Sequence, residues 1–153
     1  MKLAAHLVFP ILVLASSCVT TEPPPEKRVR LEIRLASFEP TPGYKQMRVL
    51  DSQQLIYVGA VEVVGDREVV TAAVREGAEG QTRIALQLSQ GGAKRLHVAT
   101  VASLDKPFAV MIDGKLVAAP VVREPIASGQ LEISGMFDDL EALEIVDSIN
   151  EGR

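Results

Sequence analysis

The sequence predicts an α+β fold in which helices pack on one face of a mostly antiparallel sheet. Two segments, 29–35 and 81–88, alternate apolar and polar residues with a period of two, which is typical of half-buried strands. Two later segments, 89–104 and 138–149, repeat apolar residues with the helical period. An Asp-Gly pair at 113–114 separates two apolar runs and therefore predicts a tight turn between antiparallel strands.

The region from residue 29 to residue 80 is expected to begin with a strand. In segment 29–35, apolar Val29, Leu31, Ile33 and Leu35 share one face, and charged residues occupy the other. The segments that follow are expected to be a Pro- and Gly-containing loop at 38–51, a short strand at 55–58, and a short helix at 64–73 with Asp66 near its N-terminus.

The strand at 81–88 is followed by a change of period, which predicts a helix. Ser89 precedes the helical pattern and is a residue type that accepts hydrogen bonds from the first turn of a helix. The apolar positions of this helix are Ala93, Leu96, Thr100 and Val101, with Leu104 at its exit.

A hairpin and a last helix complete the predicted domain. Strands at 107–112 and 116–122 flank the Asp-Gly turn, and Pro120 implies a sheet edge or a bulge because proline has no N–H to donate. Another strand is expected at 131–134. Asp138, with Glu141 three residues later, is typical of a helix N-terminus. The buried stripe of that helix is predicted to be Leu140, Leu143, Val146 and Ile149.

The N-terminal residues predict an exported protein. Lys2 precedes an apolar run at 3–14, and small residues lead into Cys18, the single cysteine of the chain. A lone cysteine cannot form an internal disulfide, and the Leu-Ala-Ser-Ser-Cys spacing resembles a bacterial lipobox. The resemblance implies a signal peptide at 1–17 and lipidation of Cys18. An ordinary cleavage site with a free thiol and an uncleaved membrane anchor are the alternatives.

The residues after Cys18 are expected to tether the folded domain. Segment 18–28 contains three successive prolines and almost no apolar surface, which favours an extended spacer. The folded domain is therefore expected to span residues 29–152. Without residues 1–17, 15 basic residues stand against 20 acidic ones, so the sequence argues against nucleic-acid binding.

The residue inventory predicts a protein that is not an enzyme and needs no cofactor or metal. His97 is the single histidine after the signal segment, so no second His or Cys exists for a metal site or a Cys-His pair. The glycines at 91–92 precede Lys94, but the spacing of a phosphate-binding loop is missing. The acidic residues at 138–141 are accounted for by helix capping.

Several spaced motifs resemble the head of the first periplasmic domain of SecD, an accessory subunit of the bacterial protein-export translocase. These motifs are Leu86 to Leu96, Thr100, Ala109 to Lys115, Ala119 to Ile126, Gly129, Ile133 to Phe137, and Glu141-Ala142. Their common order makes the resemblance more specific than any one motif. It implies a ferredoxin-like, SecD-head-type sandwich and a protein-binding surface.

The sequence departs from this family in two ways. Ser103 and Asp105 stand where family members usually have Asn and Gly, and Asp tolerates positive φ less readily than Gly. SecD also spans the membrane several times and couples movement of its head to proton flux, whereas no second membrane-length apolar stretch follows Cys18. The resemblance therefore implies a fold and a kind of surface, and not an energised motor.

The strongest candidate for partner binding is the loop after the predicted hairpin. Its residues are Val122, Arg123, Glu124, Pro125 and Ile126, which combine charged and apolar side chains with a rigid proline. The alternative is structural: Arg123 and Glu124 form a local ion pair and Ile126 closes the core. A second candidate is the edge strand at 116–122, because sheet edges accept extended peptides.

These observations predict an envelope lipoprotein that displays a SecD-head-like domain and binds a protein or an extended peptide segment. It is expected to be accessory to protein export or to the handling of unfolded chains. The alternative is an assembly or inhibitor module that recognises one folded envelope protein. Val19 after the cysteine favours the outer membrane if the cell has two membranes. No nucleic acid and no small-molecule cofactor are expected as partners.

Overall fold

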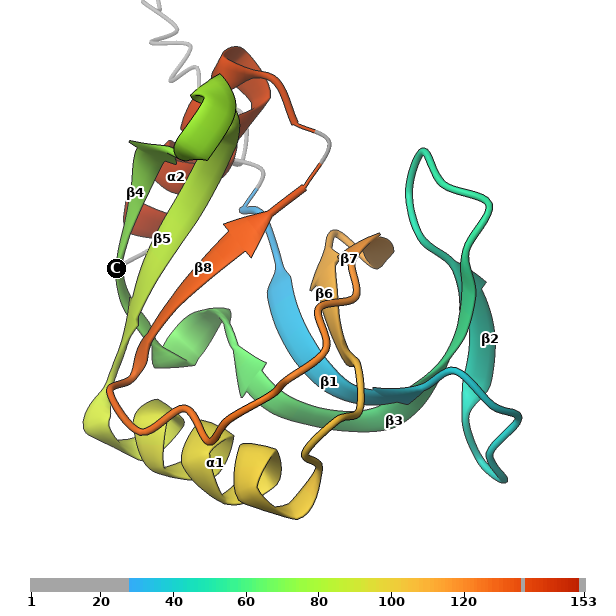
Figure 1. The fold of residues 1–153 in the computed structure, drawn as a ribbon. Helices are drawn as coiled ribbons and strands as arrows, with labels where there is room; N and C mark the ends of the chain where they lie inside the picture. The colour runs from blue at the N-terminus through green and yellow to red at the C-terminus, as the bar shows by residue number, and fades with distance from the viewer. Residues whose placement is uncertain (1–27, 136, 152–153) are drawn as a thin grey trace, which may run out of the picture.

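The computed structural model describes residues 28–135 and 137–151, which form eight strands, two α-helices and two short 3-10 turns (Figure 1). Cys18 and the predicted signal and most of the tether lie outside the described residues. The elements in chain order are β1 (Leu31–Ser37), β2 (Lys45–Arg48), β3 (Leu55–Gly65), η1 (Asp66–Glu68), β4 (Val69–Glu76), η2 (Ala78–Gly80), β5 (Thr82–Leu88), α1 (Gln90–Ala102), β6 (Phe108–Ile112), β7 (Lys115–Ala118), β8 (Gln130–Ser134) and α2 (Asp139–Glu151).

The strands form two antiparallel sheets. One has five strands in the order β2-β3-β1-β6-β7, and the other has three in the order β4-β5-β8. Every described strand pairing is antiparallel. The predicted α+β class with antiparallel pairing is therefore confirmed, and the strands are divided between two sheets.

The five-stranded sheet curls strongly, so that the turn after β2 approaches the opposite edge strand, β7 (Figure 1). The N–H of Leu50 donates to the carbonyl of Leu116, with an N···O distance of 2.7 Å. Curling covers one face of the sheet, and the small sheet and the helices cover the other, so every residue of β6 is buried. This explains why β6 is a continuous apolar run although its neighbours are antiparallel.

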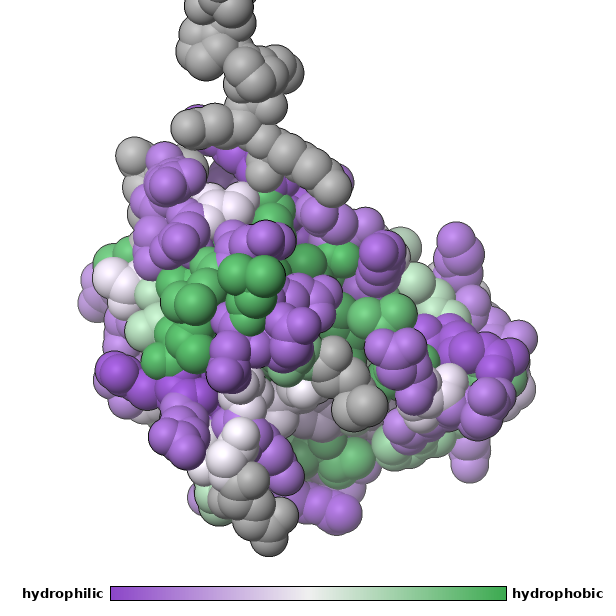
Figure 2. Space-filling view, turned by 90° about the horizontal axis from the view of Figure 1, so that it is seen from above, coloured by the Kyte–Doolittle hydropathy of each residue, from purple (hydrophilic) through white to green (hydrophobic). Residues whose placement is uncertain are grey.

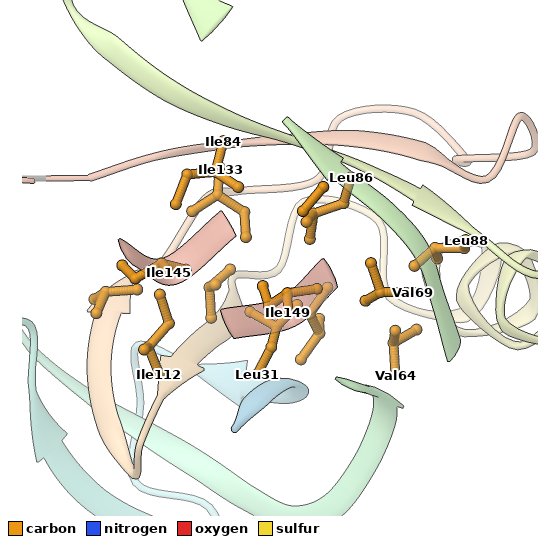
Figure 3. Packing of buried hydrophobic residues seen from close by; sticks show 14 of the residues in the cluster. Leu31, Val64, Val69, Ile84, Leu86, Leu88, Ile112, Ile133, Ile145 and Ile149 are labelled. Carbon is orange, nitrogen blue, oxygen red and sulfur yellow. The ribbon is translucent and has the colours of Figure 1, made fainter. Parts of the chain in front are cut away.

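The main core lies between the two sheets and the helices. Ile145 and Ile149 of α2 lie between apolar side chains from both sheets, among them Leu31 and Ile84 (Figure 3). A second, smaller cluster lies on the other face of the five-stranded sheet and is centred on Ile56. The five-stranded sheet thus separates two apolar clusters.

The helix predicted at 64–73 is wrong. Only Asp66–Glu68 form a short 3-10 turn, and Val69 to Glu76 form strand β4. Val69 and Ala72 are buried at a spacing of three because a bulge interrupts pairing with β5 between Val69 and Thr71. The helix was predicted from Val69, Val70 and Ala73, but Val70 lies at this bulge and is 49% exposed.

Other boundaries and faces also differ from the predictions: the strand predicted at 116–122 ends at Ala118, and Val101 of α1 is 51% exposed. The segment predicted as a loop at 38–51 contains β2, and the short strand predicted at 55–58 extends to Gly65 as β3. In α2 the buried residues are Ala142, Ile145, Val146 and Ile149. Leu140 and Leu143, predicted to be buried, are 67% and 48% exposed.

The space-filling view shows separate apolar areas divided by polar ones on the face seen from above (Figure 2).

The caps and the hairpin turn are confirmed. Ser89 Oγ accepts the N–H of Gly92, and Asp138 Oδ1 accepts the N–H of Glu141. Asp113 and Gly114 both have positive φ, at 50° and 76°, as a type I′ turn requires. Asp105 also has positive φ, at 58°, so it adopts the backbone region that glycine tolerates most readily.

Candidate groove at the edge of the small sheet

The loop predicted to bind a partner is held against α1 by a buried threonine. Thr100 is fully buried, and its hydroxyl donates to the carbonyl of Leu96 at 2.9 Å. The same oxygen accepts the N–H of Ile126 at 3.1 Å. A hydroxyl can donate and accept at once, so one side chain fixes the loop to the helix. The sequence indicated Thr100 as an apolar helix position and did not indicate this bond.

The far end of the loop is fixed by close packing at Gly129. Its φ is +68°, and a Cβ placed there would lie 2.7 Å from the Cβ of Ala93 in α1. The carbonyl of Gly129 also accepts the N–H of Leu88 at 2.8 Å. Only glycine combines this backbone angle with this close approach, so the loop enters β8 at a defined position.

The charged residues of the loop remain on the surface. Arg123 forms an ion pair with Asp105, with Nη1 and Oδ1 2.9 Å apart. Both side chains are largely exposed, so the pair contributes little to folding stability. The local pair predicted between Arg123 and Glu124 is therefore replaced by one between Arg123 and Asp105. Ile126 is half-buried and packs against the main core, while its neighbours Arg123 to Pro125 are exposed.

Beside this loop lies an apolar hollow of about 290 Å³ between the segment that follows β7 and the outer side of β8. Its apolar lining comes from β1, α1, β6, the loop and β8. The apolar residues are Ile33, Leu96, Phe108, Val110, Pro120, Val121, Val122, Ile126, Leu131 and Ile133. The loop places Arg123 and Glu124 at the same hollow, and β8 adds Glu132.

A second hollow, of about 690 Å³, adjoins the first. The two share Val110, Pro120, Glu132 and Ile133, so they form one groove along β8. The second hollow ends at Asp51 and Ser52 in the turn after β2. We call this combined feature the β8 groove.

The second predicted surface, the edge strand at 116–122, is only partly available. The carbonyl of Leu116 accepts the N–H of Leu50, so the turn after β2 covers that part of the edge. The later residues Pro120 and Val121 line the groove. The predicted loop and the free part of the predicted edge therefore meet at one site.

Sequence reasoning missed the β8 side of the site. Leu131, Glu132 and Ile133 were predicted as a strand, but the sequence does not tell which strand neighbours it. Phe108 was likewise predicted only as part of a strand. The edge position of β8 depends on long-range pairing, which leaves no local signal.

Outside the groove, the side chains that could serve catalysis or metal binding lie in positions with a structural role. His97 lies half-buried in α1, and its Nδ1 has no hydrogen-bond partner among the described residues. Within 28–135 and 137–151, no three His, Cys, Asp or Glu side chains gather closely enough to hold a metal ion. None of the helices in these ranges is both long and apolar enough to span a membrane.

Glu68 joins the two sheets to α1. Its carboxylate accepts the N–H of Gly65 at 2.9 Å and contacts the guanidinium of Arg95 at 2.5 Å. Burial raises the pKa of Glu68, but the Gly65 hydrogen bond and Arg95 outweigh burial, so the pKa is lowered overall. The carboxylate is therefore ionised at neutral pH and holds the base of α1 on the β3–β4 connection.

A family model described as the SecDF P1 head subdomain matches residues 43–153, which include the whole β8 groove apart from Ile33. Among curated proteins, SecD of Acidaminococcus fermentans is 38% identical over 63 residues, or 41% of this chain and 15% of that protein. SecDF of Thermus thermophilus is 33% identical over 73 residues, or 48% of this chain and 10% of that protein. The chain thus spans a small part of the length of these relatives.

Solved SecDF structures have the same fold. One, of SecDF in a super-membrane-facing form, superposes with a TM-score of 0.67 at 22% identity, covering 80% of this chain and 19% of that one. Another, of a SecDF membrane component that enhances protein export, gives a TM-score of 0.64 at 20% identity and covers 80% of this chain and 62% of that one.

Proposed function

The chain belongs to the SecDF P1 head subdomain family, and from this membership we propose that it is an envelope lipoprotein whose domain binds polypeptide in the service of protein export. The domain is related to protein export through its family. The anchor, the accessory role and the bound polypeptide are the parts proposed here. In this proposal the chain supplies a binding surface and no catalytic group.

The observation that carries the proposal is the β8 groove beside a loop fixed at both ends. Ile126 and Gly129 are held to α1, so the apolar wall formed by the loop is already ordered before a ligand arrives. Little conformational entropy is then lost on binding, which favours affinity. The apolar floor suits apolar side chains of an unfolded segment.

Crosslinking from the groove tests the proposal. A photoreactive amino acid at exposed Glu124 should trap many unrelated exported polypeptides in cells. The matched control places the same group at Leu140, which is exposed on α2 and outside the groove lining. Equal yields at both positions, or products from Leu140 alone, would remove the groove from the proposal.

A second candidate function is recognition of one folded envelope protein, as in an assembly or inhibitor module. The exposed Arg123–Asp105 pair beside a fixed loop favours it, because fixed charges select a partner of defined shape. The two candidates differ in the products of the Glu124 crosslink. A single product of constant mass supports the module, and a broad set of products supports the chain binder.

Anchoring at Cys18 supports placement in the envelope, facing the periplasm or the exterior. Replacing Cys18 with Ala should move the protein from the membrane fraction to the soluble fraction, because the lipidated residue is lost. Retention of this variant in membranes after high-salt washing contradicts the anchor. Val19 favours the outer membrane where two exist, and density-gradient fractionation of the unaltered protein checks that sorting.

A further inference from the structure

The two outer edges of the three-stranded sheet, β4 and β8, differ in the hydrogen bonding of their main-chain groups. On β4, the side-chain amide of Asn150 accepts the N–H of Ala72 and donates to the carbonyl of Ala72, each at 3.0 Å. These main-chain groups point away from β5 and would otherwise be available to a further strand. The side chain of Asn150 therefore satisfies the outward main-chain groups of Ala72, and a further strand cannot pair with them.

The outer edge of β8 has main-chain groups directed into the groove. Leu88 donates to Gly129, which makes that pair a hydrogen-bonded one. The alternation of an antiparallel ladder then makes Leu86–Leu131 and Ile84–Ile133 hydrogen-bonded pairs as well. The intervening residues Glu132 and Ser134 direct their N–H and C=O groups away from β5.

The facing wall of the groove also presents main-chain groups. The N–H of Phe108 donates to Pro120 and the N–H of Val122 donates to Lys106, on either side of the Pro107–Val121 bridge. In this pattern Val121 directs its own N–H and C=O away from Pro107. Val121 and Glu132 both line the smaller hollow, so two strand edges border the same space.

We propose that the occupant of the β8 groove is an extended peptide segment that enters as an added strand and pairs with Glu132 and Ser134 of β8, and with Val121 on the other side. This inference rests on the proposed function and specifies how a chain would be held. Main-chain pairing is largely independent of side-chain identity, while alternate side chains would face the apolar floor. Proline-containing or helical segments do not fit.

The charges around the groove favour peptides that carry basic residues. Asp51 and Glu124 carry carboxylates at its borders, whereas Glu132 is paired with Arg83 at 3.2 Å and Arg123 is paired with Asp105. A segment with Lys or Arg next to its apolar residues is therefore attracted, and its affinity should fall as salt concentration rises.

The test uses the full chain purified in detergent and a fluorescent ten-residue peptide that alternates Val and Ser between terminal lysines. Two N-methylated versions remove the N–H groups of odd or of even residues and leave the side chains unchanged. A paired strand uses one set of N–H groups for each neighbour. We expect both methylated peptides to bind at least about tenfold more weakly than the parent, as lost hydrogen bonds predict.

Variants of β8 test the same contact from the protein side. Glu132→Pro removes an N–H that points into the groove and leaves the ladder to β5 intact, whereas Glu132→Ala keeps that N–H and removes the carboxylate. We expect Glu132→Pro to weaken peptide binding at least about tenfold and Glu132→Ala by less than about threefold at high salt. Ser134→Pro against Ser134→Ala repeats the comparison, in case Glu132→Pro melts early by circular dichroism.

The outcomes separate this inference from the proposed function. Binding that is unaffected by N-methylation and by both proline variants overturns strand addition, while binding in the groove still stands. No binding of the parent peptide, together with no Glu124 crosslinks, overturns both. A stable dimer of the chain that the parent peptide does not dissociate would make a second copy the occupant and overturn the peptide assignment.

Discussion

The two faces of the five-stranded sheet are buried in different ways. The inner face meets the small sheet and both helices in the main core, where side chains such as Ile84 and Leu31 are covered from several directions. The other face is covered mainly because the sheet curls over itself around Ile56 and Met111. One cluster depends on contacts between separate layers, and the other depends on the curvature of one layer.

This difference indicates which of the two apolar clusters determines the geometry of the groove. Ile33, Leu96, Phe108 and Ile133 belong to the main cluster and also line the groove. In the second cluster, Val49 lines the groove near the turn after β2, but Ile56 and Val58 do not. Substitutions in the main cluster should therefore affect both folding and binding, and those at Ile56 or Val58 should affect mainly folding.

The largest expected effect is in the main cluster. Ile84→Ala should lower the free energy of unfolding by about 4 kcal/mol, because Ile84 is 1% exposed and surrounded by several layers that cannot all collapse onto the cavity. Denaturant titration measures the loss, and peptide binding should weaken with it. A loss below about 1 kcal/mol would show that the layers relax freely.

A smaller effect is expected in the second cluster. Ile56→Ala should cost about 2 kcal/mol, although Ile56 is also fully buried, because a curled sheet can tighten around the removed atoms. The same denaturant titration gives the value. If Ile56→Ala costs as much as Ile84→Ala, or weakens peptide binding equally, the distinction between the two faces is lost.

An ionic group at the border of the second cluster gives the third effect. Glu32 lies beside Met111 in the sheet, its side chain is 6% exposed, and it contacts Arg30 and Arg34 at 2.6 Å each. Glu32→Gln keeps the shape and removes the charge, and should lower the free energy of unfolding by about 1.5 kcal/mol. Glu62→Gln, at a weaker contact of 3.8 Å to Arg30, is the matched control and should have little effect.

The smallest effect is pH-dependent and lies at the connection between the two sheets. Because the pKa of Glu68 is lowered in the folded protein, its ionised form adds stability above the ordinary glutamate pKa, and this stability is lost as pH falls through the lowered value. Glu68→Gln should cost about 1 kcal/mol at pH 7. Unfolding curves at pH 7 and pH 3 check this, and an unchanged difference would assign the cost to shape and not to charge.

The sequence predicted those features that depend on neighbouring residues. The Asp113–Gly114 turn and the caps at Ser89 and Asp138 are local, and all three are confirmed. β4 was predicted as a helix from Val69, Val70 and Ala73, but a bulge shifts the strand pairing at Val70 and leaves this residue exposed. Local patterns cannot reveal such a shift unless the partner strand is known.

The candidate site was predictable in part for the same reason. The loop at 122–126 stood out by composition, and the sequence left open whether Ile126 faces the core or a ligand. The structure gives it both kinds of contact, since Ile126 packs on the main core and lines the groove. The partner wall, β8, is placed there by pairing with β5, which no short motif encodes.

The position of β1 has a mechanical consequence. β1 is the first strand in the chain, yet it lies in the middle of its sheet, paired in antiparallel fashion with β3 on one side and β6 on the other. A force applied through residue 28 in the direction of β1 would act across hydrogen bonds on both sides of the strand, and these bonds would have to yield together. A pull along β1 would load the pairings with β3 and β6 in shear, the direction in which a sheet resists extension most strongly.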